Sequence, residues 1–563
     1  MSTEYQQEIR ICSGWLRARI VVPGLILLGL SLYLPAVNWG LPALDSWSQD
    51  TIAGRRTLGA VEGWPEHWQG RYPPLHYLVL RATYEPILRH WQSTGQWRVD
   101  AETGRPVIAE PHPPKFGLLL LVGNLMSVVM GIATCVGIWC ATLAFFESRH
   151  LDENNHPNVG RLAALFASLI TMLNADFAYF SRLGNVDVPS ACWIAWSLFF
   201  YARVLRTGSI LHCAALGLFG SLAMSAKDSA AGLFPGMAIV LLVTECQRRA
   251  TGASMSSGLL RAILQWKWLL GTALFLAPYL LLNNVHANPD SYLERMRYWL
   301  SPDPTSLHAM QLRYDSSLDL AIASILFAAS AIGWHVVIAG LFAVVYAAGK
   351  EKTIAIAWLL PCLSYYVLII ERLDFVYSRF LFPMVLCLAI PFAWCIARFT
   401  LLSRWPRWIR AALPMLLLVP SLGMCLNVAL AMLHDTRYDA EDWFRNHVPP
   451  SASIGATSKP QYLPRLVEMG YPTYRVEMNV DQLRQPSTDY IVLSSYDYVD
   501  YSSPQRECMD ALTSGQLAYE VVTVFEPDLR FSLESWLSIA SRGAPQIGKI
   551  SPTIIVLRRT TSP

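Results

Sequence analysis

Charged side chains interrupt the long apolar runs of this sequence at only a few places. An ionised group in apolar surroundings is costly unless it is paired or used, so these residues are the first candidates for chemistry. The residues that stand out are Asp45, Asp50, Arg71, Arg182, Asp187, Lys227 and Arg379. Together they offer several cations and several carboxylates, which is the composition of a site that binds an anion and moves a proton.

This combination suits the transfer of a sugar from a lipid-linked sugar phosphate. Lysine and arginine can neutralise a phosphate and stabilise it as a leaving group. An aspartate close by can deprotonate an acceptor hydroxyl or amine as a general base. The base must lie on the same side of a membrane as the phosphate. This interpretation therefore depends on which side of the membrane each residue occupies.

Each of these residues also has an ordinary structural interpretation. Asp50 can be a solvated loop residue or a helix N-cap. Asp187 stands where a helix is expected to start. Lys227 and Asp228 can pair with each other or reach toward water, and Arg379 can be a positional anchor at the start of a span. The side of the membrane they share is therefore more informative than any single residue.

The composition requires a membrane environment. Of the 563 residues, 53% are hydrophobic and only 15% are charged, and the mean hydropathy is +0.32. Soluble domains carry about 25% charged residues because their surface must be wetted. A basic patch interleaved with exposed aromatic residues is not evident, which argues against a nucleic-acid partner and leaves membrane lipid as the expected surroundings.

Apolar runs long enough to cross a bilayer recur along the chain and predict about eleven spans. The predicted spans are 19–37, 116–146, 161–180, 188–206, 210–226, 229–245, 266–283, 317–347, 353–370, 379–398 and 411–433. The segment 73–90 is apolar on average but contains Arg81, Glu85 and Pro86. We expect it to be a helix lying in the outer interface rather than a span.

The distribution of lysine and arginine predicts the sidedness. If the N-terminus is cytoplasmic and 73–90 is not counted as a span, the short segments rich in lysine and arginine all face the cytoplasm. Short loops of this composition usually stay on that side of the membrane. These segments contain Arg10, Arg17, Arg19, Arg149, Arg203, Arg206, Arg248, Arg249, Arg261, Lys350, Lys352, Arg404, Arg407 and Arg410. The candidate residues of the first outer loop (38–115) and of the later motifs then all lie on the outer face.

The residues after 433 differ in pattern from the rest. YDAEDWFRNHV (438–448) has the spacing of an amphipathic helix, and DYIVLSS, YEVVTVF and TIIVLRR are β-branched runs typical of strands. The predicted fold is therefore an all-α polytopic membrane domain over 1–433, followed by a small α/β domain over 434–563 on the outer, extracytoplasmic side.

Six short motifs then resemble one family, in the same order along the chain. They are GLPALDSWSQDT, GRYPPLHYLVL, SRLGNVDVPSACW, GSLAMSAKDSAAGLFP, YSRFLFPMVLCLAIP and DTRYDAEDWFRNHVPPSASIG. With these motifs the chain resembles the GT-C glycosyltransferases, in particular the branch of protein O-mannosyltransferases and bacterial lipid A aminoarabinose transferases. The resemblance runs through most of the chain and implies a GT-C-like fold.

The resemblance also implies roles for individual residues. The catalytic acid falls on Asp50, with Asp45 as its close rival. The contacts to the donor and to its lipid phosphate fall on Arg71, Tyr72, Arg182, Asp187, Lys227 and Arg379. Some branches of the family use a divalent ion and others none. If Mg²⁺ or Mn²⁺ takes part, Asp50 and Asp187 are its expected ligands.

The implied reaction is an inverting transfer from a polyprenyl-phosphate sugar to a glycan, lipid or protein acceptor. No lectin-like repeat of the eukaryotic protein mannosyltransferases is evident. This indicates a prokaryotic enzyme of the cytoplasmic (inner) membrane, with its active site on the extracytoplasmic side.

Two other functions stay open from the sequence. A transporter or flippase of lipid-linked saccharides would need polar residues deep in its spans, but the central portions of 116–146, 317–347 and 411–433 are nearly free of ionisable residues, with His335 as the main exception. A non-catalytic scaffold that binds a partner through its outer tail predicts that Asp50 is dispensable. The near absence of deep charges favours an active site open to one side.

Overall fold

The protein is described by a computed structural model. The residues that it describes are 18–42, 47, 51, 72–99, 106–108, 113–146, 157–249, 265–300, 314, 316–457, 460–477, 479–483, 488–495, 503–527 and 550–560. Asp45, Asp50 and Arg71 lie outside these ranges.

The chain divides into two compact units. The first, which we call the helical unit, contains Met1–Leu34, Ile52–Glu85 and Gly123–Cys425. The second, which we call the tail unit, contains Pro35–Thr51, Pro86–Val122 and Leu426–Pro563. The segment Pro35–Thr51 therefore belongs with the C-terminal residues, although it follows directly on the first predicted span.

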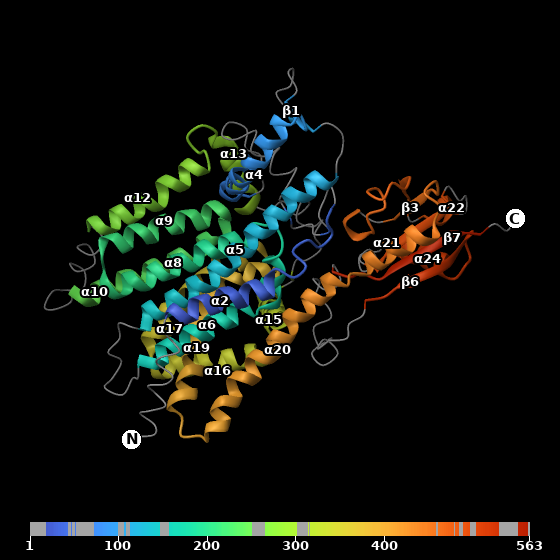
Figure 1. The fold of residues 1–563 in the computed structure, drawn as a ribbon. Helices are drawn as coiled ribbons and strands as arrows, with labels where there is room; N and C mark the ends of the chain where they lie inside the picture. Colours follow the sequence, from blue (N-terminus) through green and yellow to red (C-terminus); the bar gives the residue numbers. More distant parts are fainter. Residues whose placement is uncertain are drawn as a thin grey trace. The chain divides into compact units, whose positions relative to one another are not determined.

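The helical unit is built from apolar helices that run alongside one another (Figure 1). The helices before residue 250 are α2 (Ala18–Tyr33), α4 (Leu75–Ser93), α5 (Pro113–Phe146), α6 (Pro157–Met172), α7 (Ala175–Phe180), α8 (Asp187–Thr207), α9 (Ile210–Ala226), the 3₁₀ turn η1 (Asp228–Leu233) and α10 (Phe234–Arg249). Later helices are α12 (Trp266–Leu282), α13 (Pro289–Leu300), α15 (Ser317–Ile332), α16 (Trp334–Lys350), α17 (Lys352–Tyr365) with the π-turn η2 (Tyr366–Ile370), α18 (Glu371–Leu373), η3 (Ser378–Leu381), α19 (Phe382–Leu402) and α20 (Arg407–Leu433).

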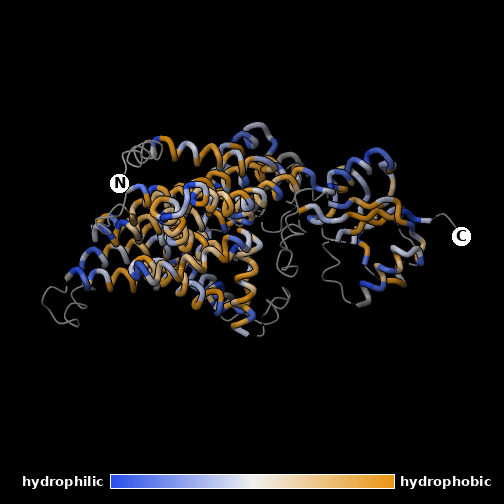
Figure 2. Tube along the Cα trace, turned by 90° about the horizontal axis from the view of Figure 1, so that it is seen from below, coloured by the Kyte–Doolittle hydropathy of each residue, from blue (hydrophilic) through white to orange (hydrophobic). Residues whose placement is uncertain are grey.

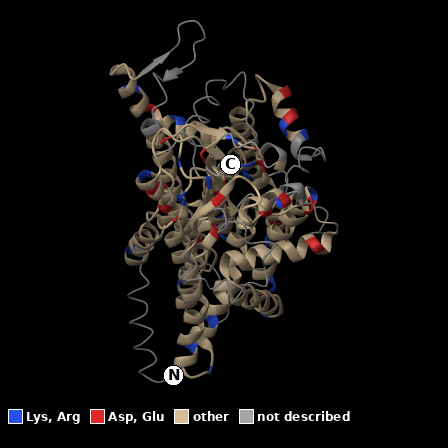
Figure 3. Cartoon of the chain, turned by 90° about the vertical axis from the view of Figure 1, so that its right-hand side faces the viewer, with Lys and Arg blue, Asp and Glu red and all other residues tan. Residues whose placement is uncertain are grey.

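The predicted fold class is confirmed. Within the described residues, six helices are long and apolar enough to cross a membrane, or up to seven if one bent pair counts as a span. Four more apolar helices are shorter, at Arg19–Tyr33, Asn158–Met172, Ile210–Ala226 and Trp266–Leu282. Hydrophobic residues run along these helices (Figure 2), and Figure 3 shows little charge along most of their length. The number of about eleven spans stays a prediction, as does the interfacial position of the helix α4.

Two predicted spans are interrupted in the structure. The segment predicted as one span over 317–347 bends by 119° between α15 and α16. Gly333 makes this bend with a φ of +89°, in a region that side chains disfavour. The hydroxyl of Ser421 donates to the Ile332 carbonyl at 3.0 Å and so satisfies a group at the break. The segment predicted over 161–180 is likewise two helices, because α6 ends at Met172 and α7 begins at Ala175.

Glycines bring two of the helices into close contact. A methyl group added at Gly217 of α9 would lie 2.0 Å from the carbonyl oxygen of Gly271 in α12. A methyl group added at Gly271 would lie 3.0 Å from the carbonyl oxygen of Cys213. Backbones that approach this closely pack by van der Waals contact, which is the main attraction between helices in lipid.

The C-terminal part of the tail unit is a five-stranded sheet with helices on both faces. Its strands are β3 (Ile454–Ala456), β4 (Thr473–Arg475), β5 (Tyr490–Ser494), β6 (Tyr519–Phe525) and β7 (Ile554–Arg559), in the order β4-β3-β5-β7-β6. The strand β3 runs parallel to β4 and β5, and β7 runs antiparallel to β5 and β6. The three predicted strands are β5, β6 and β7, and the structure adds two short ones.

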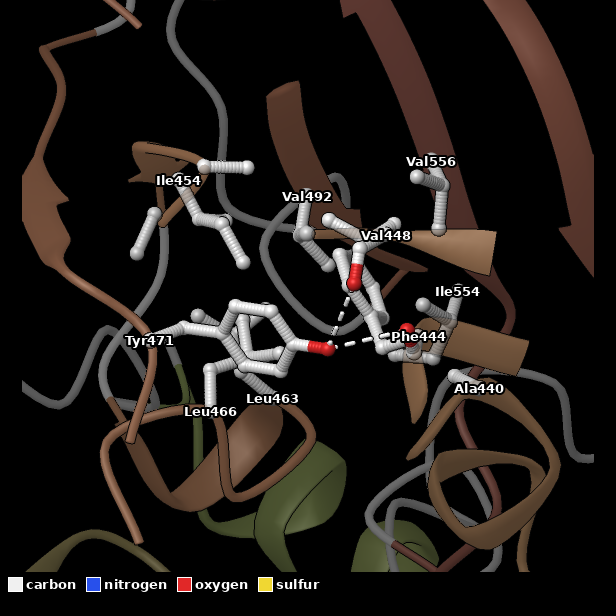
Figure 4. Packing of buried hydrophobic residues seen from close by; sticks show 12 residues of the cluster. Ala440, Phe444, Val448, Ile454, Leu463, Leu466, Tyr471, Val492, Ile554 and Val556 are labelled. Atoms are coloured by element: carbon white, nitrogen blue, oxygen red, sulfur yellow. Dashed lines mark hydrogen bonds between the residues drawn. The ribbon is translucent and has the colours of Figure 1, made fainter. Parts of the chain in front are cut away.

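Alternating side chains of the strands fill the cores on the two faces of this sheet. Val492 of β5 packs with Phe444 of α21 (Thr436–His447), as Figure 4 shows. The hydroxyl of Tyr471 donates to the Phe444 carbonyl at 2.9 Å, near the end of that helix. Leu493 packs on the other face with Leu512 of α24 (Ser503–Thr513). Smaller elements of the unit are η4 (Pro460–Tyr462), α22 (Val480–Leu483) and a hairpin of β1 (Trp97–Val99) and β2 (Pro106–Ile108).

Candidate active site

Three residues predicted to contact the donor come together in the helical unit. Asp187 is the first residue of α8, Lys227 lies between α9 and η1, and Arg379 lies in η3. The Lys227 ammonium forms an ion pair with one carboxylate oxygen of Asp187. The Nε of Arg379 lies 3.9 Å from the other. We call these three residues the charge cluster.

Asp187 is held in place by the loop before it. The side-chain oxygen of Asn185 accepts hydrogen bonds from the backbone N–H groups of Asp187, at 2.8 Å, and Val188, at 3.2 Å. These bonds satisfy two of the free N–H groups at the start of α8. The amide nitrogen of Asn185 donates to the Phe180 carbonyl at 3.1 Å. The carboxylate at this position is also favoured by the positive end of the helix dipole.

Lys227 occupies the interruption between two helices. Its backbone is extended, with φ −156° and ψ 118°, so α9 ends at Ala226 and η1 starts at Asp228. Its ammonium nitrogen lies 4.0 Å from the ring centroid of Phe380, a contact that favours a cation. The hydroxyl of Tyr365 donates to the Phe380 carbonyl at 2.8 Å, which fixes the segment that carries both Phe380 and Arg379.

Asp228 does not pair with Lys227, contrary to the structural interpretation drawn from their adjacency. Its carboxylate oxygen Oδ2 lies 3.2 Å from the Nε of Arg295 in α13, and its Oδ1 accepts a hydrogen bond from the Tyr279 hydroxyl at 3.1 Å. Arg295 also donates to the side-chain oxygen of Asn283 at 2.5 Å. The reason for the different pairing is the extended backbone at Lys227, which turns neighbouring side chains in different directions.

The charge cluster is largely removed from water. The side chains of Lys227 and Asp187 are 8% and 4% exposed, whereas that of Arg379 keeps 16%. Two cationic side chains lie beside one carboxylate. Arg379 also lies beside aromatic rings, with its guanidinium carbon 5.4 Å from the ring centroid of Tyr377. A buried group of this kind suits an anionic ligand that brings its own negative charge.

The other predicted site residues lie in different surroundings. Arg182 is fully buried and donates to the carbonyl of Ala178 at 2.6 Å and to the carbonyl of Leu32. These bonds join α7 to the end of α2, and a phosphate contact of Arg182 stays a prediction. Tyr72 is half-buried just before α4. The predicted catalytic residues Asp45 and Asp50, and Arg71 as well, are outside the described residues.

Some buried polar residues near the motifs were not predicted from the sequence. His76, two residues after the Pro-Pro pair, is only 1% exposed, and neither of its ring nitrogens has a hydrogen-bond partner. Burial lowers the pKa of His76 to about 3, so the imidazole is neutral. Tyr279 and Arg295 were missed because each lies in an ordinary amphipathic or apolar pattern. The sequence pointed only to Lys227 as a partner of Asp228, whereas the structure pairs Asp228 with Arg295.

A metal site is not evident in the part of the chain that the structure describes. Nowhere among those residues do three or more histidine, cysteine, aspartate or glutamate side chains gather as metal ligands would. Asp187, one of the two expected ligands of Mg²⁺ or Mn²⁺, pairs with two cationic side chains. The other, Asp50, is not among the described residues, so the use of a divalent ion stays a prediction.

Comparisons with known proteins give distant likenesses. No family model matches the chain, and no curated protein does either. One similar solved structure is the oligosaccharyltransferase AglB of Archaeoglobus fulgidus, in complex with an inhibitory peptide and a dolichol-phosphate. It is 11% identical, with a TM-score of 0.45, over 96% of this chain and 88% of that one.

Another is ArnT of Cupriavidus metallidurans bound to undecaprenyl phosphate. It is 14% identical, with a TM-score of 0.43, over 96% of this chain and 98% of that one. Both proteins are GT-C glycosyltransferases, the class whose motifs this sequence resembles. At these identities and scores, the likeness is too distant for an activity or a ligand to be transferred to this chain.

Proposed function

We propose that this chain is a membrane glycosyltransferase of the GT-C class that takes a sugar from a polyprenyl-phosphate donor at the outer face of the membrane. The observation that carries the proposal is the charge cluster. Lys227 and Arg379 are separated by about 150 residues of sequence, yet both reach the carboxylate of Asp187. Such a pair of cations is suited to hold the phosphate of the donor.

The proposed reaction is a single displacement. An oxygen or nitrogen of the acceptor attacks the anomeric carbon of the sugar, and the bond from that carbon to the phosphate oxygen breaks. The electron pair leaves with the polyprenyl phosphate, whose negative charge Lys227 and Arg379 stabilise. The proton of the acceptor passes to a carboxylate, for which Asp50 is the first candidate and Asp45 the second. The configuration at the anomeric carbon inverts.

The test separates binding from transfer in the purified full-length chain. Undecaprenyl phosphate serves as the binding probe, and sugar release from a polyprenyl-phosphate donor serves as the assay. Arg379→Gln is expected to weaken binding of the probe, because it removes a cation beside the phosphate. Asp50→Asn is expected to leave binding intact but to lower transfer by about 10²- to 10⁴-fold, the usual contribution of a general base.

Matched variants make the result decisive. Arg404→Gln, an exposed arginine of a predicted cytoplasmic loop, should leave both quantities unchanged, and Asp45→Asn tests the rival base. Full transfer in both aspartate variants would rule out the proposed base. A wild-type chain that moves the intact donor across the bilayer without releasing its sugar would instead identify a flippase.

A further inference from the structure

The beginning of the first outer loop is packed into the tail unit. The indole nitrogen of Trp39 donates to the Asp435 carboxylate at 3.0 Å. The backbone N–H of Gly40 donates to the Tyr438 hydroxyl at 2.8 Å. Trp39 and Trp47 are each only 2% exposed, although both belong to a segment between two membrane helices. These two tryptophans therefore fix part of that segment against residues nearly four hundred positions later in the chain.

Trp47 lies against two arginines and a tyrosine. The guanidinium carbon of Arg437 is 4.0 Å from its ring centroid, and that of Arg465 is 5.3 Å away. The ring of Tyr438 lies 4.9 Å from it, centroid to centroid. A cation over an indole ring is the strongest of the cation–π contacts, and burial strengthens it further.

Carboxylates hold the two guanidinium groups ready for this contact. Asp435 accepts from the Nε of Arg437 at 2.8 Å and from its terminal nitrogen at 2.7 Å, and neither side chain is exposed. Glu441 accepts from Arg465 at 2.8 Å and 2.6 Å in the same two-point manner. A planar guanidinium fixed along one edge keeps its face free to lie against a ring. The contact with Trp47 then needs little further ordering.

The anchored residues lie close in sequence to both predicted catalytic aspartates. Trp39 precedes Asp45 by six positions, and Trp47 stands two after Asp45 and three before Asp50. Only two or three residues of chain join Trp47 to each of these aspartates, and a chain of that length has a short reach. A base must lie within hydrogen-bond distance of the proton that it removes, so a limit of this kind matters for transfer.

We propose that the tail unit is a positioning device for the acidic loop, in which Trp47, Arg437 and Arg465 form an anchor that sets the place of the catalytic aspartate. This inference rests on the proposed function. In this arrangement the three residues touch neither donor nor acceptor. They act through the loop, which makes the C-terminal domain necessary for transfer without any contact to substrate.

The first arm of the test measures the anchor without using activity. Trypsin cleavage after Arg55 or Arg56 in the same loop is followed in the purified full-length chain. Trp47→Ala and Arg465→Met should each speed this cleavage about tenfold, the loss expected for a buried cation–π contact. The double variant should be no faster than Trp47→Ala alone, because Trp47→Ala already removes the contact that Arg465 makes with the ring. Arg558→Met, whose ion pair with Glu520 is half-exposed, is the matched control and should not change the rate.

The second arm measures transfer in the same variants. Trp47→Ala should lower kcat by about ten- to a hundredfold, as expected for a displaced catalytic group, and leave the KM for the donor unchanged. Trp47→Phe should restore most of the rate, because a ring remains for the guanidinium groups. A general loss of structure would instead lower binding and rate together and would not respond to the choice between alanine and phenylalanine.

The outcomes distinguish this proposal from the one on which it rests. Wild-type cleavage in Trp47→Ala would overturn the anchor. Faster cleavage with an unchanged kcat would overturn its role in positioning the base and leave the glycosyltransferase standing. A wild-type chain without transfer activity would overturn the function, and with it the positioning role, whereas the cleavage rates would still report on the anchor.

Discussion

The charge cluster illustrates how the ends of helices bring distant residues together. Asp187 starts one helix, Lys227 ends another, and Arg379 lies in a short turn before a third. The motifs identified each residue, because a charge beside an apolar run is conspicuous. They did not predict the pairing. The adjacency of Lys227 and Asp228 suggested that these two charges meet, and only the extended backbone at Lys227 reveals why they do not.

Removal of one partner of this buried pair should be costly. Asp187→Asn removes the carboxylate that pairs with the Lys227 ammonium, so the free energy of unfolding should fall by about 3–5 kcal/mol. The double variant Asp187→Asn with Lys227→Met should recover much of that loss, because the lysine charge is removed together with the carboxylate that pairs with it. Thermal unfolding of the full-length chain in detergent measures the loss in the single variant and the recovery in the double variant.

A partly exposed ion pair serves as the control for the buried pair of Asp187 and Lys227. Arg81 and Glu85 of α4 form an ion pair with side chains 37% and 36% exposed, and Arg81→Met should cost less than about 1 kcal/mol. If the Asp187 and Lys227 variants destabilise additively instead, the two residues do not act as a buried pair.

At the scale of elements, hydropathy predicted the helices well where each apolar run is one straight helix. The predicted spans 210–226 and 266–283 correspond to Ile210–Ala226 and Trp266–Leu282 in the structure. The bend at Gly333 was not predicted, because apolar residues continue on both sides of the glycine and a hydropathy average does not register backbone direction. The strands β3 and β4 were missed because three residues are too few to display alternation.

The contact between α9 and α12 leads to a prediction about glycine. Gly217→Ala places a methyl group where the Gly271 carbonyl oxygen already lies, and overpacking of this kind costs about 1–3 kcal/mol or more. Gly340 in α16 has nothing within 4 Å of an added methyl group. Gly340→Ala should therefore be neutral or stabilising by up to about 1 kcal/mol, from helix propensity.

Unfolding temperatures of the two alanine variants, measured in the same detergent, test this prediction. The unfolding temperature should fall in Gly217→Ala but not in Gly340→Ala. Equal shifts for Gly217→Ala and Gly340→Ala would show that α9 and α12 are not in backbone contact.

At the scale of the whole molecule, the tail unit should lose stability in acid. In the tail unit, Asp489 accepts hydrogen bonds from the backbone N–H and the hydroxyl of Ser453, each at 2.8 Å. These bonds, with a smaller contribution from the charge of Arg559, hold the pKa of Asp489 below its ordinary value. The ionised form is thus favoured in the folded tail unit.

The sign of the pH effect follows from this shift. The folded-state pKa lies below that of the unfolded chain, so the stabilisation is fully present above the unfolded value of about 3.9. It is lost as the pH falls through the folded value, beginning at about pH 5. Calorimetry of the full-length chain should show the unfolding temperature of the tail unit falling with acid, and less so in Asp489→Asn. An identical pH dependence in the wild type and in Asp489→Asn would contradict this assignment.

The hydrogen bond from Trp39 to Asp435 also has a consequence for how the protein is made. Its two partners are 396 residues apart in the chain. At roughly 5–20 residues per second, the ribosome needs roughly 20–80 s to proceed from one partner to the other. During that time Trp39 has been synthesised but Asp435 has not. The burial of Trp39 against Asp435 is therefore a late event in the biogenesis of the protein.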